Sequence, residues 1–163
     1  MNTNAAGDSS QPLAKRNLAV VQEFQQAQNV QDLARCLALL DDEVVFDVGR
    51  GRYAGKPAVA DFLKMLFRLE TRGSDAVLTA EGDDRVLARW KNVDSDLKRI
   101  GLASLELQAT YTLRNGRISL LQARPTAAAL ADLRAAQAAG GDAEGLRLAQ
   151  AAGTLSVPER RGQ

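Results

Sequence analysis

Histidine is absent from this 163-residue chain, and cysteine occurs only once, as Cys36. Without histidine the chain cannot form histidine-based triads or proton shuttles, and most zinc and iron sites are excluded as well. We therefore expect neither a metal nor another cofactor. A single cysteine cannot form an intrachain disulfide. Cys36 lies in an apolar helical stretch, where a buried packing thiol is expected rather than a nucleophile.

The chain also lacks an excess of either charge and has no long apolar runs. The formal net charge is +1, which gives no reason to expect nucleic acid or a membrane surface as the partner. No segment is apolar for long enough to cross a membrane, and residues 1–12 lack the pattern of a secretory signal. A cytoplasmic location is expected. Aromatic residues make up only 4% of the chain, so each is expected at a packing or ligand position.

Apolar spacing predicts three helices in the first part of the chain. Apolar residues recur at three-residue steps over 13–28, which is typical of a helix with a narrow buried stripe. Asn29 has N-cap chemistry and Asp32 supports the same helix start, so a second helix is predicted to reach Leu40. A third helix opens at Pro57, where the missing proline N–H costs nothing. Its predicted buried face consists of Val59, Phe62, Leu63, Leu66 and Phe67.

Strand signals precede and follow the third helix. The run 44–48 is β-branched and aromatic, which predicts a strand. Residues 94–101 are predicted as a charged loop. Asn115 and Gly116 form the strongest short hairpin signal in the chain. Four further strands, paired by hairpins, are predicted over 76–81, 85–93, 104–114 and 117–124.

The stretch 104–114 alternates between apolar and polar residues, which predicts one wall in a core and one in water. Its apolar face consists of Leu105, Leu107, Ala109, Tyr111 and Leu113. By the same alternation, Trp90 and Asn92 share one face of their strand, opposite Arg89 and Lys91.

The C-terminal part is alanine-rich. Thr126 is predicted to cap a helix that ends at Ala139, with Leu130 and Leu133 as its only large apolar residues and hence weak docking. A further short helix is expected over 142–152. The predicted organisation is a flexible leader (1–12), a cone domain (13–124), a helical extension (125–152) and a disordered tail (153–163).

Helices gathered on one face of an antiparallel sheet predict an α+β domain. We expect a curved antiparallel sheet with three N-terminal helices, which together form a cone, and an extra C-terminal helix. A hollow between the concave side of the sheet and the helices would then form a ligand pocket.

Several runs make the chain resemble a known family. Residues 19–24, 29–33 and 41–47 are similar to the opening of steroid Δ-isomerases. The run 53–59 is similar to the glycine-led start of the third helix in the SnoaL-like (nuclear-transport-factor-two-like) superfamily. Its two hairpins resemble the runs 82–86 and 113–118. The resemblance covers 18–124 and implies the cone fold, but this fold hosts isomerases, dehydratases, cyclases, epoxide hydrolases and non-enzymatic binding modules.

The resemblance to ketosteroid isomerase implies that Asp47 is a general base, because it matches the aspartate that moves a proton next to a carbonyl. The matching oxyanion hole is missing. Phe24 stands where the helix tyrosine would be and Ala109 where the strand acid would be, and neither can donate a proton. Authentic steroid isomerisation is not expected.

Two other activities of the fold are not expected either. The epoxide hydrolase needs an arginine and two aspartates, and these positions fall at Trp90, Asn92 and Ala123. A scytalone-dehydratase-like mechanism uses paired histidines, which this chain lacks.

Two interpretations of each candidate residue stay open. Asp47 is either a base inside the pocket or a surface carboxylate paired with Arg50 or Arg52. Trp90 either lines a ligand site or fills the core, and Asn92, if buried, needs hydrogen-bond partners that a ligand could supply. The predicted pocket residues are Phe24, Trp90, Asn92, Leu107, Ala109 and Tyr111.

Two functions follow from these interpretations. The first is an apolar pocket for a small hydrophobic molecule, with metal-free proton transfer of the isomerase, cyclase or lyase type if the site is catalytic. The alternative is a non-enzymatic binding or accessory module whose cone is filled by its own side chains. A homodimer through the sheet is expected from the fold in either case.

Overall fold

The computed structural model describes residues 10–49 and 51–139. The elements in chain order are α1 (Ser10–Asn29), α2 (Leu33–Ala38), β1 (Leu40–Val48), β2 (Gly51–Ala54), α3 (Lys56–Arg68), β3 (Arg72–Glu81), β4 (Arg85–Val93), α4 (Ser95–Arg99), β5 (Leu105–Arg114), β6 (Arg117–Pro125) and α5 (Ala127–Ala138). The predicted tail (153–163), the helix predicted over 142–152 and most of the leader lie outside the described residues.

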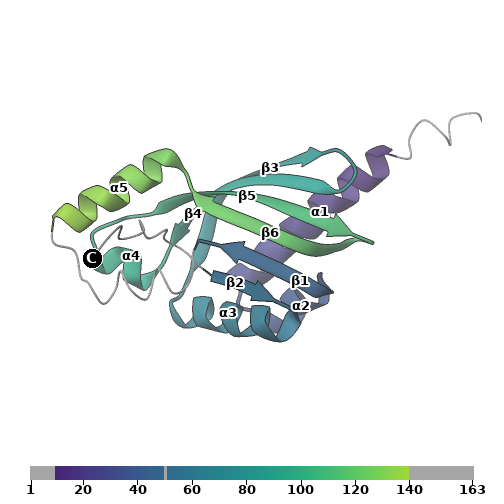
Figure 1. Cartoon of the computed structure of the whole chain (residues 1–163), viewed down its shortest axis with the longest axis horizontal. Helices are drawn as coiled ribbons and strands as arrows, with labels where there is room; N and C mark the ends of the chain where they lie inside the picture. Colours follow the sequence, from purple (N-terminus) through teal and green to yellow (C-terminus); the bar gives the residue numbers. More distant parts are fainter. Residues whose placement is uncertain (1–9, 50, 140–163) are drawn as a thin grey trace, which may run out of the picture.

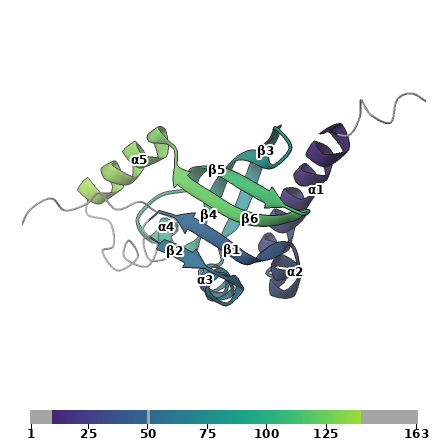
Figure 2. The ribbon, with the colours of Figure 1, turned by 45° about the vertical axis from the view of Figure 1, so that its right-hand side comes forward.

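All six strands belong to one curved, unclosed sheet with the order β2-β1-β6-β5-β4-β3. Neighbouring strands are antiparallel except β1 and β6, which pair in parallel. Helix α1 crosses one face of the sheet and α3 lies against β1 and β2, whereas α5 lies at the opposite end of the sheet from the start of α1 (Figures 1 and 2). The predicted α+β fold with helices on a curved sheet is confirmed.

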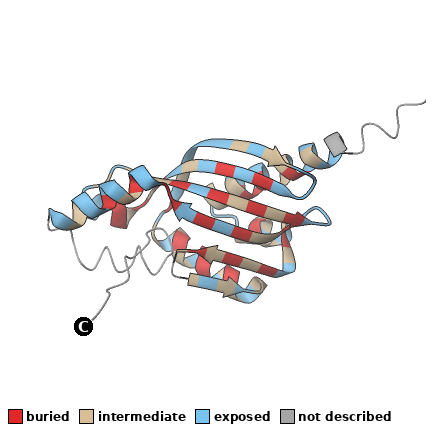
Figure 3. Ribbon diagram, turned by 45° about the horizontal axis from the view of Figure 1, so that its top comes forward, coloured by how far each residue is buried: buried red, intermediate tan, exposed pale blue. Residues whose placement is uncertain are grey.

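Alternation along the strands decides which side chains face the helices. On β5, Leu105, Leu107, Ala109, Tyr111 and Leu113 are buried as predicted, and the residues between them are half-buried or exposed. Red and paler bands accordingly alternate along the strands in Figure 3. The Asn115–Gly116 turn also forms as predicted, with positive φ angles of 53° and 74° that match the twist of a tight hairpin.

Three local predictions differ from the structure. The second helix is capped by Asp32, whose side chain accepts a hydrogen bond from the Arg35 N–H, and it ends at Ala38. The chain after Gly49 returns as the short strand β2, which was not predicted because its four residues carry too little apolar pattern. Within the predicted loop, Asp94 caps α4 through a bond from the Leu97 N–H.

The C-terminal helix is capped by Thr126 as predicted, since its hydroxyl accepts a hydrogen bond from the Ala129 N–H. The apolar side chains of α5 pack against residues of α4 and β5. Ala129 and Leu133 complete a small apolar cluster, and its other members are Leu97, Ile100, Leu105 and Leu107. No helix among the described residues is long and apolar enough to cross a membrane.

Candidate functional site

A cavity of about 220 Å³ lies between the C-terminal half of α1, the edge strand β3 and its neighbour β4. Amide side chains dominate its wall. The residues that line it are Gln22, Gln25, Gln26, Gln28, Asn29, Gly73, Ser74, Asp75, Ala76, Trp90, Asn92 and Tyr111. Three of the six predicted pocket residues therefore share one cavity. Its wall is more polar than the predicted apolar pocket.

Trp90 fixes the orientation of the Asn92 amide. The Trp90 Nε1–H donates a hydrogen bond to Asn92 Oδ1 at 2.7 Å. An indole N–H can only donate, so the amide oxygen must face it and the amino group must point elsewhere. Asn92 is only 7% exposed, and its amino group has no partner among the described residues. The amino group is therefore a hydrogen-bond donor at the cavity wall that a ligand acceptor can use.

A pair of hydrogen bonds joins α1 to β3 at another part of the cavity wall. Asn29 Nδ2 donates to the Gly73 carbonyl at 3.0 Å, and the Gly73 N–H donates to Asn29 Oδ1 at 2.9 Å. Gly73 also lets the tryptophan ring approach the backbone, because a Cβ there would lie 3.2 Å from Trp90 Cδ1. The Asn29 side chain thus joins α1 to β3 at the cavity wall, although the sequence predicts that Asn29 caps the second helix.

Tyr111 supplies a second donor. Its hydroxyl oxygen accepts one long hydrogen bond, from Gln25 Nε2 at 3.5 Å. Burial raises the pKa of Tyr111 to about 12, and the bond from Gln25 opposes this only in part. The phenol therefore stays protonated at neutral pH and can donate its proton to a ligand.

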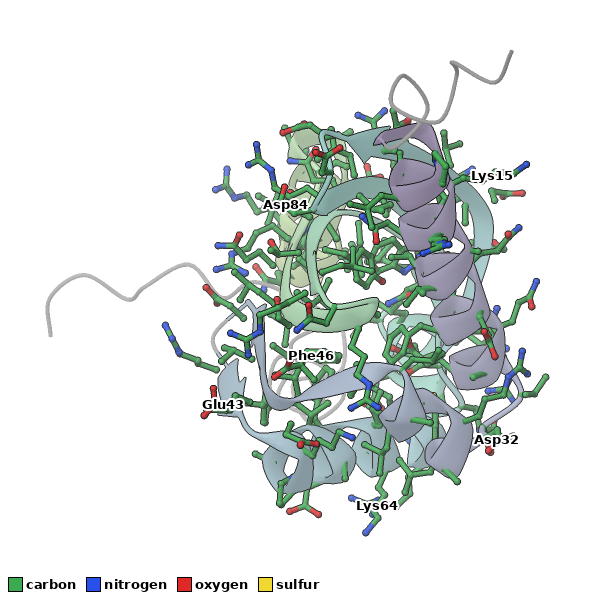
Figure 4. All side chains as sticks on the ribbon, turned by 90° about the vertical axis from the view of Figure 1, so that its right-hand side faces the viewer. Lys15, Asp32, Glu43, Phe46, Lys64 and Asp84 are labelled. Atoms are coloured by element: carbon green, nitrogen blue, oxygen red, sulfur yellow. The ribbon has the colours of Figure 1, made fainter. Side chains whose placement is uncertain are left out.

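The inner part of the cone is almost filled. A space of about 40 Å³ remains there, lined by Phe46, Leu107 and neighbouring apolar residues, and it shares Gln28, Trp90 and Tyr111 with the larger cavity. Phe24, Phe46 and Phe62 pack edge to face, with ring centroids 6.0 and 6.1 Å apart. Figure 4 shows Phe46 inside the molecule, whereas the labelled Asp32 and Lys64 lie at its periphery.

Asp47 does not face this interior, which agrees with the second of the two interpretations of this residue, a surface carboxylate. Phe46 and Val48 are buried beneath the sheet, and alternation places Asp47 on the outer face. There Arg124 Nη2 lies 3.0 Å from Asp47 Oδ1, and Arg124 Nη1 donates to the Asp47 carbonyl at 2.9 Å. The surface ion pair weighed above is present, with Arg124 as the partner. A base needs reach to its substrate, and this carboxylate lines neither inner cavity.

The remaining predicted residues separate in space. Leu107 borders the small inner space together with Trp90 and Tyr111. Phe24 is fully buried against Phe46 and Tyr111 and reaches neither inner cavity. Ala109 lies in the core but lines neither of the two, because its single methyl is too short to reach them.

Sequence reasoning missed the amides of α1. Their signal was present, since Gln22, Gln25, Gln26 and Asn29 follow the i, i+3, i+4, i+7 spacing of one helix face. The β3 segment 73–76 has no comparable signal, because its role depends on pairing with β4.

The single thiol is buried as predicted. Cys36 has no exposed surface, and burial, with a smaller effect of the nearby Asp32 charge, raises its pKa to about 12. Such a thiol is a poor nucleophile. Among residues 10–49 and 51–139, no group of three histidine, cysteine or acidic side chains is arranged to hold a metal ion.

Comparison with solved structures gives several similar folds. A protein from Xanthomonas campestris with a provisional assignment as a polyketide cyclase is 26% identical, and the match covers 68% of this chain and 90% of that one at a TM-score of 0.59. An NTF2-like protein of unknown function from Cytophaga hutchinsonii is 15% identical, with 68% and 89% covered and a TM-score of 0.57. A provisional ketosteroid isomerase from Kribbella flavida is 14% identical, with 69% and 78% covered and a TM-score of 0.59.

The two more distant structures show the fold alone. Comparison with curated proteins gave no match. The family model of the SnoaL-like domain matches residues 21–121, which is more than half of the chain and includes all the residues named above as lining the larger cavity. On this match, and with a sheet and helices arranged as in its structural neighbours, the chain belongs to the SnoaL-like domain family.

Proposed function

We propose that this SnoaL-like domain binds a small, largely apolar molecule that carries a carbonyl or similar hydrogen-bond acceptor. The observation that carries the proposal is the Asn92 amide on the cavity wall, whose oxygen accepts from the Trp90 N–H and whose amino group has no protein partner among the described residues. A ligand acceptor there replaces water, and one such hydrogen bond contributes a net gain of about 1 kcal/mol. The protonated Tyr111 hydroxyl supplies a second donor on the same cavity wall.

The size of the cavity limits the ligand. The two inner spaces measure about 220 and 40 Å³ and share Trp90 and Tyr111. For comparison, a cavity of about 150 Å³ accommodates benzene. A molecule with one or two rings therefore fits, and a four-ring steroid does not. The named polyketide cyclases among the structural neighbours are compatible with a carbonyl-bearing ligand, but their substrates are not assigned to this chain.

The test uses two probes of the same shape. Acetophenone has a carbonyl, and α-methylstyrene replaces its oxygen with a CH₂ group. Trp90 is the single tryptophan of the chain, so its indole N–H gives one NMR resonance at the cavity. We expect both probes to shift that resonance, with acetophenone binding about fivefold to tenfold tighter, as one hydrogen bond predicts.

Two variants identify the donors. Asn92→Asp keeps an oxygen for the Trp90 N–H but removes the amino group, and Tyr111→Phe removes only the hydroxyl. Each should lower acetophenone affinity and leave α-methylstyrene affinity nearly unchanged. Gln108→Glu, an exposed amide change on the outer face, is the matched control. Equal affinities of the two probes for the unaltered protein would disprove the acceptor assignment.

A second candidate is an accessory module that acts as a homodimer. The packed rings of Phe24, Phe46 and Phe62 favour it, because they leave little room deep in the cone. The outer face of β4, β5 and β6 carries an open hollow of about 470 Å³ beside the exposed Leu87, and a second copy could cover it. This candidate predicts a dimer mass by light scattering, reduced to a monomer mass by Leu87→Asp, and no shift of the Trp90 resonance with either probe.

A further inference from the structure

Strand β3 is interrupted by a bulge at the cavity. Ser74 pairs with Lys91 and Val77 pairs with Arg89, so two residues of β3 stand opposite Trp90 alone. The first of them, Asp75, has a positive φ of 54°. In bulges of this kind the first residue is commonly a glycine in the left-handed region. Asp75 therefore holds a strained conformation that a glycine would adopt without cost.

The bulge changes the chemistry of the cavity wall. It places Asp75 and Ala76 on the wall, beside Trp90. Asp75 is the one formally charged side chain among the described residues that line this cavity; the others are amides, small residues and aromatics. Asp75 is exposed, and it forms no ion pair or hydrogen bond with another described residue. Its charge is therefore available to a ligand.

Trp90 adds a second preference for positive charge. The face of an indole ring attracts cations through its quadrupole. Trp90 and Asp75 are opposed across the bulge and border the same space, and no basic side chain lines that space among the described residues. A carboxylate and an indole face together favour an ammonium group and disfavour a carboxylate.

We propose that Asp75 is a specificity-determining residue that makes the cavity select small amine cations over neutral and anionic molecules of the same shape. This inference rests on the proposed function, because the acceptor end of the same ligand binds Asn92 and Tyr111. An ammonium group on that ligand would lie beside Asp75, in the cavity that Trp90 also borders. The strained backbone at Asp75 is consistent with a residue that serves binding at a cost in stability.

The experiment compares three probes with one ring and one acetyl group each: acetophenone, 4-acetylbenzylamine and 4-acetylbenzoate. Affinities come from NMR titration of the Trp90 indole resonance in the full chain. The carboxylate is exposed, so we expect the amine to bind about threefold to fivefold tighter than acetophenone and the acid to bind more weakly. The preference should shrink between about 20 mM and about 500 mM salt, where screening is much stronger.

Two variants of Asp75 separate the effect of its charge on ligand preference from the effect of its backbone conformation on stability. Asp75→Asn should remove the preference for the amine while acetophenone affinity stays the same. Asp75→Gly should remove it as well and also raise the thermal midpoint by a few degrees, because the left-handed strain disappears. Asp132→Asn, an exposed change on α5 that does not line the cavity, should keep the preference.

The outcomes distinguish the two proposals. If acetophenone binds tighter than α-methylstyrene but the amine binds no tighter than acetophenone, or if Asp75→Asn retains the preference, the role of Asp75 is overturned and the proposed function stands. If none of the three probes shifts the resonance, both proposals are overturned.

Discussion

The described residues form two apolar clusters, which differ in size and in composition. The main cluster lies between the helices and the sheet and contains the aromatic residues Phe24, Phe46 and Phe62. The small cluster joins α4, the start of β5 and α5, contains no buried aromatic residue, and adjoins the buried carboxyl groups of Asp94 and Asp96. Trp90 packs against both clusters.

The two clusters therefore differ in their expected roles: the main cluster stabilises the fold, whereas the small cluster contacts the cavity residue Trp90. The main cluster is larger and rich in edge-to-face aromatic contacts, so most of the apolar burial that stabilises the fold lies there. The small cluster contains fewer apolar groups and supports the opposite side of Trp90. Because Trp90 also borders the cavity, the small cluster can influence the cavity without contributing most of the folding free energy.

The largest expected effect is at the centre of the main cluster. Phe46→Ala should lower the free energy of unfolding by about 3–5 kcal/mol, because it removes a fully buried ring that contacts Phe24 and Phe62. Urea unfolding monitored by circular dichroism measures the change. Val45→Ala, a half-buried position on the other face of β1, should cost much less. Equal losses would contradict the comparison.

A smaller effect is expected in the small cluster. Leu133→Ala removes a fully buried side chain, but one whose neighbours can partly relax, so a loss near 2 kcal/mol is expected. Leu130→Ala on the same helix is half-buried and should cost less. Hydrogen exchange should show faster opening of α5 in Leu133→Ala while the centres of β1 and β6 stay protected. Global loss of protection would show that the two clusters fold as one unit.

The smallest effect concerns the buried acid beside the small cluster. Burial raises the pKa of Asp94, the bond from the Leu97 N–H opposes this, and the Asp96 charge adds to it. A carboxyl whose pKa is raised in the folded state stabilises that state only while protonated, so stability is lost as the pH rises through the raised value. Asp94→Asn keeps the cap acceptor and avoids this loss.

We therefore expect the thermal midpoint of Asp94→Asn to exceed that of the unaltered protein by an amount that grows as the pH rises from about 4, the usual aspartate value, toward 7. Asp61→Asn, at an exposed position on α3, should show no such trend. A variant that is less stable at pH 7 would show that the charge of Asp94 is compensated.

Particular residues show how far the sequence could be interpreted. Alternation correctly predicted the buried faces of β4 and β5, and the Asn115–Gly116 turn fixed a hairpin, because both depend on near neighbours in the chain. The site was less predictable. Trp90, Asn92 and Tyr111 were predicted and do share a cavity. For Asp47 the sequence left a base in the pocket and a surface carboxylate both open, and the residue lies on the outer face with Arg124.

The sequence by itself determined the kind of elements, their order and most of their buried faces, because helix and strand periodicity are local properties. Only the tertiary structure decided which polar groups meet. The two hydrogen bonds between Asn29 and Gly73 join residues that are 44 positions apart. The bulge that places Asp75 opposite Trp90 is defined by the pairing of β3 with β4. Such contacts depend on register and packing between distant segments, which no local pattern encodes.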